Sequence, residues 1–163
     1  MDYRIEERGD EVLEEVMELD REVSWEVMDE AYRSSMSYEE YARRHREVFL
    51  SIYNSPGRQR FIVAYDASGR LAGVAWIKEE MDTVNYERYA YLYDLEVRRE
   101  HRRRGLGRAL LERAIEYCRR NGYDRIGLRV ELRNSAALRL YLRAGFRPSA
   151  LFMELRLDGG ASS

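Results

Sequence analysis

The stretch Arg102-Arg103-Arg104-Gly105-Leu106-Gly107-Arg108 decides how the rest of this 163-residue chain is interpreted. It follows an alternating apolar segment, residues 91–97, and leads into a helical pattern whose apolar stripe contains Leu106, Leu110, Ala114 and Tyr117. The first N–H groups of a helix have no partner inside the helix, and the helix dipole is positive at this end. Glycines let a ligand approach the backbone, and arginines add charge and forked donors. The stretch therefore predicts an anion-binding turn between a strand and a helix.

The basic stretch is also compatible with simpler structures. Residues 98–104 could be a solvated charge run or a nucleic-acid patch, and Gly105-x-Gly107 could simply be a tight turn. The dinucleotide-binding fingerprint is excluded because Leu110 occupies the place of its third glycine, and no Gly-Lys-Ser/Thr follows to make a Walker motif. The net charge is −2 and the pI is about 5.9, so the positive charge is local. This balance weighs against nucleic acid as the partner.

The residues after this helix continue the alternation of strands and helices. Asn121-Gly122 supplies a helix stop, and residues 126–132 alternate between apolar positions and polar or glycine positions. This alternation predicts a strand with one apolar face. Asn134-Ser135 then begins a further helix, which Gly145 closes before Phe146.

This order of strand, basic glycine turn, helix, strand and Asn-capped helix resembles the GCN5-related N-acetyltransferase superfamily. The matching motifs are Arg102-x-x-Gly105-x-Gly107 and Asn134-x-x-Ala137-x-x-x-Tyr141-x-x-x-Gly145-Phe146. Both lie within residues 91–147. The two motifs at this separation identify the family far more specifically than either motif does alone.

The resemblance implies an α+β fold of the acyl-CoA N-acyltransferase type. The expected sheet is mixed but mostly antiparallel, with six to seven strands and about four flanking helices. It splays apart between its fourth and fifth strands, and acyl-CoA would lie in that opening. The length of the chain suits one domain, residues 1–157, followed by a disordered tail at residues 158–163.

Patterns in the first half of the chain fit this architecture. Asp10 lies near the cap of a helix whose apolar stripe reaches Leu19, and a second helical stretch covers residues 25–32 after a break near Ser24. Ser37-x-x-Glu40 is a capping box for a third helix. Strands are expected at residues 3–6, 61–65, 71–77 and 89–97, with a hairpin turn at 66–69 and a last strand after the final helix.

The resemblance also implies which residues bind acetyl-CoA as the cosubstrate. Backbone groups of Leu95 and Val97 would bond the pantetheine arm and the acyl carbonyl, residues 102–108 would hold the diphosphate, and Asn134 would bond the pantetheine region. Tyr141 would donate a proton to the departing CoA thiolate. Simpler roles are a helix cap for Asn134 and an aromatic anchor of Phe146 for Tyr141. No metal is expected, because CoA itself brings the activated acyl group.

The resemblance does not settle which residue is the general base. Several relatives carry a glutamate four residues before the position of Val97, but Tyr93 stands there in this chain. Asp94 and Glu96 are the neighbouring candidates, with Asp94 slightly preferred, and a water relay with no essential base fits equally well. A bulge in this strand is a family trait that would break the alternation of faces. Counting therefore does not assign the faces of Asp94 and Glu96, and each could be an ordinary carboxylate that faces water.

The acceptor is expected to be a primary amine, which could be a small amine, a peptide N-terminus or a lysine. Where this family usually holds its acceptor, the chain carries Trp25, Tyr32, Tyr38, Tyr41, Tyr86, Tyr89 and Tyr91 with the acids Asp29, Glu30, Asp82 and Glu87. Such a mouth would suit a cationic amine. The donor could carry acetyl or a longer acyl group. The alternative to an active N-acetyltransferase is a CoA-binding regulatory module that has lost turnover.

Cysteine, histidine and apolar runs narrow the class of protein further. Cys118 is the only cysteine, so no internal disulfide can form, and a packed structural thiol is expected. His45 and His101 show no metal-ligand spacing with it, and His101 is expected on the loop surface beside the diphosphate. No run of about 18 apolar residues and no apolar N-terminal signal are present. We therefore expect a cytoplasmic protein that binds neither membranes nor nucleic acid, with a homodimer left open.

Overall fold

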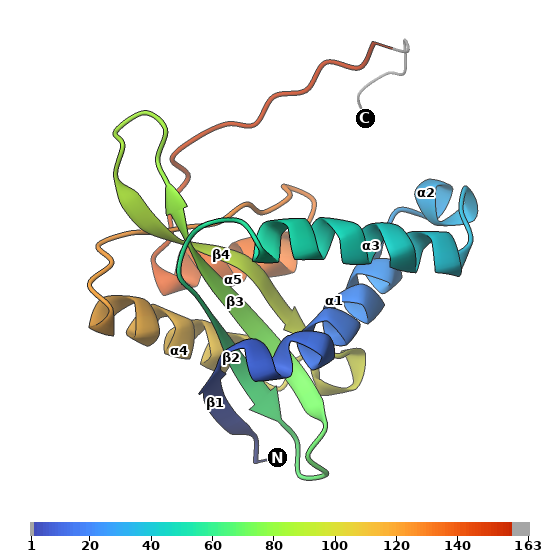
Figure 1. The fold of residues 1–163 in the computed structure, drawn as a ribbon, viewed down its shortest axis with the longest axis horizontal. Coiled ribbons are helices and arrows are strands. Elements are labelled where there is room, and N and C mark those ends of the chain that lie inside the picture. The colour runs from blue at the N-terminus through green and yellow to red at the C-terminus, as the bar shows by residue number, and fades with distance from the viewer. Residues whose placement is uncertain (1, 158–163) are drawn as a thin grey trace. The chain divides into compact units, whose positions relative to one another are not determined.

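The computed structural model describes residues 2–157 (Figure 1). Contacts divide the chain into two compact units, Met1–Arg129 and Val130–Ser163. The elements of the first unit are β1 (Arg4–Arg8), η1 (Asp10–Val12), α1 (Leu13–Val27), α2 (Glu30–Ser34), α3 (Tyr38–Tyr53), β2 (Gln59–Tyr65), β3 (Leu71–Met81), β4 (Arg88–Val97), η2 (Arg99–His101), α4 (Leu106–Arg120) and β5 (Ile126–Gly127). The second unit contains α5 (Ser135–Ala144). No helix within residues 2–157 is long and apolar enough to cross a membrane.

The sheet of the first unit follows the chain in the order β1-β2-β3-β4-β5. The first three pairings are antiparallel, and β4 pairs with β5 in parallel. The hairpin expected around residues 66–69 joins β2 and β3, where Gly69 donates its N–H to the carbonyl of Asp66 at 3.0 Å. The mixed, mostly antiparallel α+β fold predicted from the sequence is therefore confirmed.

The number of strands is lower than predicted, because the described residues form five strands rather than six to seven. Of the alternating stretch at residues 126–132, only Ile126 and Gly127 pair with β4. Residues 146–157, where a last strand was expected, form no strand either. Alternation marks which face of a segment is apolar, but a strand also needs a neighbouring edge that accepts its backbone hydrogen bonds.

Helices cover both faces of the sheet within the first unit, with α1 and α3 on one face (Figure 1). Apolar residues of α1 and Phe49 of α3 pack there against Phe61, Val63 and Trp76 of the strands. On the opposite face, a Cβ added at Gly73 would lie 2.9 Å from the side chain of Leu110 in α4. The absence of a side chain at Gly73 therefore lets α4 pack closely on the sheet.

Local signals predicted some helix boundaries and missed others. Ser37 caps α3 as predicted, because its hydroxyl accepts the N–H of Glu40 at 3.1 Å. The break expected near Ser24 is wrong, because α1 continues to Val27 and α2 begins only at Glu30, with Asp29 as its cap. Cys118 is the packed thiol that was expected, and burial raises its pKa to about 11.

The second unit is built around α5. The Asn134 side chain caps this helix by accepting the N–H of Ala137 at 3.2 Å. Gly145 ends it in the left-handed conformation with a φ of 102°, which favours glycine. Phe146 donates its N–H to the carbonyl of Tyr141, and the two rings meet edge to face at 5.7 Å between centroids. The helix cap by Asn134 and the packing of Tyr141 against Phe146, the simpler roles considered for these residues, are thus both observed.

Phe49 should be essential for holding α3 on the sheet. It is 4% exposed and stacks on Trp76 with 4.7 Å between ring centroids. Phe49→Ala is expected to lower the free energy of unfolding by about 3 to 5 kcal/mol, measured by urea denaturation. The matched control is Val48→Ala on the neighbouring exposed position, which should change it by less than about 0.5 kcal/mol. Equal effects of the two changes would contradict this packing of α3.

Candidate active site

The basic turn between β4 and α4 has the features of an anion-binding helix start. Gly105 is the N-cap of α4, adopts a left-handed conformation with a φ of 80°, and no side chain caps the helix there. No atom lies within 4 Å of the place where a Cβ of Gly105 would be, so the backbone is open to a ligand. The side chains of Arg103, Arg104 and Arg108 are exposed around it. The turn therefore fits the diphosphate that the sequence assigns to it.

Arg102, the first residue of the motif, has a different position from the other arginines. Its Nε donates to the carbonyl of Val97 at 2.8 Å, and its Nη2 donates to Glu26 of α1 at 2.9 Å. Its guanidinium therefore joins the end of β4 to α1. The Val97 carbonyl, which was expected to face the pantetheine arm, is engaged by this contact.

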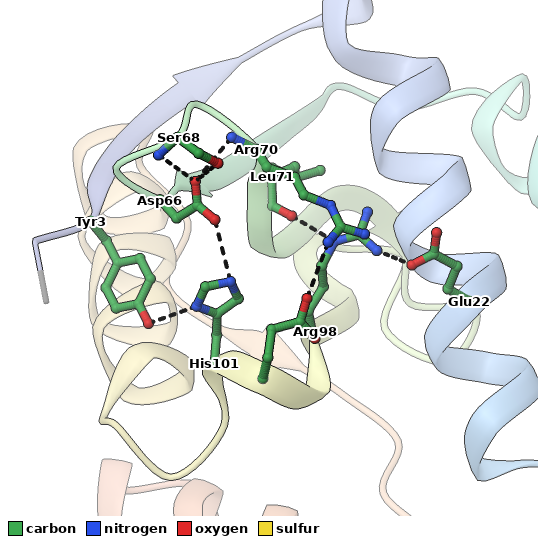
Figure 2. A network of polar contacts seen from close by, with 9 residues as sticks. Tyr3, Glu22, Asp66, Ser68, Arg70, Leu71, Arg98 and His101 are labelled. Carbon is green, nitrogen blue, oxygen red and sulfur yellow. Dashed lines mark hydrogen bonds and ion pairs between the residues drawn. The ribbon is translucent and has the colours of Figure 1, made fainter.

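Arg98, four residues before Arg102, anchors the start of the same loop (Figure 2). It is 6% exposed, its Nε donates to the carbonyl of Leu71 at 2.7 Å, and its Nη1 donates to Glu22 of α1. Its backbone N–H also donates to the carbonyl of Ala72 at 2.9 Å. Because Glu22 and Glu26 lie four residues apart on one face of α1, they hold Arg98 and Arg102 side by side.

His101 is buried, and the prediction that it lies on the loop surface is wrong. It is 7% exposed, and the Tyr3 hydroxyl lies 3.0 Å from its Nδ1 (Figure 2). Its Nε2 lies 3.5 Å from a carboxylate oxygen of Asp66 in the β2–β3 turn. A residue from the N-terminal segment and a turn distant in sequence thus cover the imidazole, which no local pattern indicates. These contacts tie the loop before α4 to the hairpin.

A β-bulge in β4 decides which side chains face α1. Asp94 pairs with Trp76 and Leu92 pairs with Ile77, so Tyr93 is an extra residue between the two pairs. Tyr93 packs against Trp76 with 5.2 Å between ring centroids, on the face covered by α1 and α3. The bulge expected from the family resemblance is therefore confirmed, and it lies at the residue that replaces the glutamate of relatives.

The bulge places both candidate bases on the face of the sheet that α1 and α3 cover. Directly paired residues of antiparallel strands point to the same side, so Asp94 follows Trp76 and Glu96 follows Val74. Both Trp76 and Val74 belong to the core beneath α1. The alternative that one carboxylate simply faces water is therefore wrong for both residues, which are partly buried.

Asp94 and Glu96 meet a third carboxylate, that of Asp20 in α1. One oxygen of each of the three residues lies within 4.8 Å of the others. Asp20 is 7% exposed, and its Oδ2 lies 2.5 Å from Nε2 of His45 in α3. Within the described residues, three acids and one imidazole thus meet where α1, α3 and β4 come together. Acidic oxygens at this spacing would also suit a divalent cation.

The environment of these acids favours their protonated forms. Burial raises the pKa of Asp94 well above its ordinary value, and the neighbouring charge of Asp20 adds to the effect. Burial also raises the pKa of Glu96, with further contributions from Asp20 and Asp94 and from a hydrogen bond with Asp20. Arg102 opposes this shift only in part. Carboxyl groups whose pKa values are raised in this way are suited to accept and hold a proton near neutral pH.

Aromatic residues from the predicted acceptor region gather beside the acids. Trp25 lies 5.3 Å from Tyr38 and 4.8 Å from Tyr41, and Tyr41 lies 5.8 Å from His45, measured between ring centroids. Tyr38 is 45% exposed, so this group reaches the surface. An aromatic surface next to partly buried acids suits a cationic group.

Asp82, an acid of the β3–β4 loop in the predicted acceptor region, already has hydrogen-bond partners within the chain. Asp82 accepts the N–H groups of Val84 and Asn85, and Arg125 donates to it at 3.0 Å. The backbone hydrogen bonds, followed by Arg125, lower the pKa of Asp82 to about 2. Its carboxylate therefore stabilises the loop through partners within the chain.

The edge of β4 next to the acids carries no partner strand within residues 2–157. β5 pairs only with Ala90 and Tyr91, so the segment from Leu92 to Val97, which includes Leu95, is paired on its β3 side alone. This segment leads directly into the basic turn. Asn134 and Tyr141 lie in the second unit, where Asn134 caps α5 and the ring of Tyr141 packs against Phe146.

Asp20 and His45 are site residues that sequence reasoning missed. Both interrupt an apolar stripe, because Asp20 follows Val16 by four residues and His45 lies midway between Tyr41 and Phe49. A polar residue at a core-facing position was the available signal. This signal did not show that Asp20 of α1 and His45 of α3 contact each other.

Comparison with known proteins identifies the family. The chain matches the model of the acetyltransferase (GNAT) family over residues 24–146, more than half of its length. The chain therefore belongs to this family, as its two motifs indicated.

Individual relatives and solved structures agree with this assignment. A putative acetyl transferase from Pyrococcus furiosus is 40% identical, with a TM-score of 0.84 that covers 96% of this chain and 100% of that one. Mycothiol acetyltransferase from Clavibacter sepedonicus is 39% identical over 95 residues, which are 58% of this chain and 29% of that relative. The chain thus spans less than a third of that protein. AAC(6')-Iy, solved with a bisubstrate analogue containing CoA, shares the fold at a TM-score of 0.68 and 17% identity, covering 96% of this chain and 98% of that one.

The raised pKa values predict how stability depends on pH. A carboxyl group whose pKa is higher in the folded state binds more protons there than in the unfolded chain. The free energy of unfolding should therefore fall as the pH rises from about 4, the ordinary carboxyl range, through the raised folded values. Glu96→Gln should make this decline shallower in urea denaturation between acidic and mildly alkaline pH. The control Asp124→Asn, at an exposed position, should leave the slope unchanged. A Glu96→Gln protein with the wild-type slope would contradict the burial of this acid.

Proposed function

We propose that this protein is an acetyl-CoA-dependent N-acetyltransferase that moves an acetyl group to a primary amine by direct attack on the thioester. One observation carries the proposal: the strand that bears Asp94 and Glu96 ends in the open, basic helix start at Gly105. The acids and the anion-binding turn are thus adjacent on β4 and its loop. Membership of the acetyltransferase (GNAT) family supports the same activity.

The basic turn fits the diphosphate of CoA, which supplies the activated acyl group when bound. Backbone N–H groups at the start of α4 would bond the diphosphate oxygens, and Arg103, Arg104 and Arg108 would neutralise their charge. Leu95, on the unpaired edge of β4, would hold the pantetheine arm and the acyl carbonyl by its backbone. Asn134 would bond the pantetheine region as well as cap α5.

Deprotonation of the amine is assigned to the acids of β4. An amine arrives as an ammonium cation, which partly buried carboxylates and the neighbouring aromatic rings would attract. Asp94 and Glu96 are both candidates for the group that accepts its proton. The hydrogen bond of Glu96 with Asp20 now favours Glu96, because it gives the accepted proton a further group to move to.

The acceptor in this proposal is a small amine, a peptide N-terminus or a lysine. The half-buried ring of Trp25 and the exposed ring of Tyr38 would contact its body while its nitrogen enters toward Asp20, Asp94 and Glu96. A CoA-binding regulatory module without turnover is the second candidate. The partly buried acid cluster favours the enzyme, because CoA binding alone would not require it.

Release of CoA from acetyl-CoA tests this function directly. The purified protein should release CoA thiol in the presence of at least one member of a panel of small amines, peptides with unblocked N-termini and lysine peptides. A chelator should leave the rate unchanged, because thioester aminolysis needs no metal. Binding of acetyl-CoA without release of CoA for any acceptor would favour the regulatory module.

Tyr141 provides the matching variant for this assay. If its hydroxyl protonates the departing thiolate, Tyr141→Phe should lower kcat by about 10- to 1000-fold with little change in acetyl-CoA affinity. Phenylalanine keeps the ring that packs against Phe146, so folding should be preserved. An unchanged kcat would mean that water protonates the thiolate. Parallel losses of binding and turnover would instead assign Tyr141 a packing role.

A further inference from the structure

Three titratable side chains form a row that leads away from β4. Glu96 of β4 lies beside Asp20 of α1, with carboxylate oxygens within 4.8 Å of each other, and Oδ2 of Asp20 is in contact with Nε2 of His45 in α3 at 2.5 Å. Ser24 adds a weaker contact to the other oxygen of Asp20 at 3.5 Å. Two carboxyl groups can share a hydrogen bond only if one of them carries the proton. A row with this spacing can therefore hold a proton between its carboxylates and pass it toward an imidazole.

Each end of this row has a polar atom that lacks a hydrogen-bond partner among the described residues. Oε2 of Glu96 and Nδ1 of His45 are buried atoms without a hydrogen-bond partner among the described residues. The His45 side chain is only 9% exposed. A buried polar atom without a partner is costly, so two of them at opposite ends of one hydrogen-bonded row indicate groups that bond something outside the chain. Glu96 provides the end of the row on β4, and His45 provides the end on α3.

We propose that Asp20 and His45 receive, through Glu96, the proton that the acceptor amine loses. Asp20 and His45 act through Glu96 and do not touch the substrate, so they are positioning residues in this reaction. The inference rests on the proposed N-acetyltransferase function. It adds a route by which the base is restored after each transfer.

The proton balance of acetyl transfer defines what this route must carry. The ammonium group of the acceptor loses one proton to Glu96 Oε2, and the amine nitrogen then forms the C–N bond to the acyl carbon. The C–S bond breaks, and the second proton of the nitrogen ends on the CoA thiol. One proton per turnover remains on the enzyme. It passes from Glu96 to Asp20 and then to His45, whose unpartnered Nδ1 would hand it to the group that bonds this buried nitrogen from outside the chain.

Several charged and titratable groups border this row. Asp94 lies beside Glu96 on β4, and Arg102 approaches from the loop before α4. Tyr41 of α3 faces Asp20, and burial, followed by the charge of Asp20, raises the pKa of its hydroxyl. Tyr41 therefore stays protonated and does not compete for the proton. Arg102 acts in the opposite direction to burial and the neighbouring acids, because its positive charge lowers the pKa of Glu96.

The pH profile of a His45 variant tests this proposal. Glutamine can still donate a hydrogen bond to Asp20, but it cannot take up a proton. His45→Gln should lower kcat by at least about 10-fold with an unchanged KM for acetyl-CoA, and it should move the ascending limb of the pH–rate profile. Arg44→Gln, at the adjacent exposed position of α3, is the control and should keep the wild-type profile. A His45→Gln enzyme with the wild-type kcat and limb would overturn the proposal.

A double variant distinguishes a shared route from two independent structural losses. If Glu96 and His45 act in one row, the combination of Glu96→Gln and His45→Gln should be little slower than Glu96→Gln alone. Rate losses that multiply would overturn the shared route, because each residue would then act by itself. Thermal midpoints of all variants show whether folding is preserved.

An NMR titration tests whether Glu96 and His45 are coupled, even if no acceptor is found. The chain has only two histidines, so the ring signals of His45 and His101 can be separated easily. If Glu96 and His45 are coupled, Glu96→Gln should change how the His45 signal depends on pH while leaving the His101 signal as it is in the wild type. A His45 titration that is unaffected by Glu96→Gln would overturn the inference. Absence of CoA release for every acceptor, with the coupled titration intact, would instead count against the proposed function.

Discussion

A β-bulge at Tyr93 determines which carboxylates of β4 meet α1. Without the extra residue, Asp94 and Glu96 would lie on the face opposite to Tyr91 and Tyr93; with it, all of them follow the face covered by α1 and α3. The bulge thus creates the acid cluster with Asp20. It also sets two acids of β4 beside one residue of α1, so the proposed proton transfer can involve more than one group.

The same helix positions the anion-binding turn. Glu22 and Glu26 of α1 hold Arg98 and Arg102, and His101 is held between Tyr3 and Asp66. Asp20 is on the same helix, two residues before Glu22. Because one rigid helix contacts both the acids and the loop, their separation is fixed by α1 and not by the loop itself. A flexible loop could not keep a diphosphate and an acyl carbonyl in register with the acids.

Local sequence signals predicted the parts of the structure that local physics determines. The cap by Ser37 at the start of α3 and the end of α5 at Gly145 follow from rules that act within a few residues. The burial of His101 and the meeting of Asp20 with His45 depend on segments far apart in the sequence, and no such rule reaches them. The stretch at residues 126–132 shows the opposite error: its alternation was real, but only two of its residues pair with β4.

Binding of acetyl-CoA at the start of α4 is the central claim, and thermal unfolding with and without the ligand tests it most directly. Acetyl-CoA at about 100 times its Kd should add about 2.7 kcal/mol to the free energy of unfolding and raise the Tm. Gly107→Glu should abolish this shift, because a carboxylate there repels the diphosphate, while the unliganded Tm should hold since an acid suits the first turn of a helix. A Tm that acetyl-CoA does not raise, or a shift that survives Gly107→Glu, would contradict the assignment of this turn.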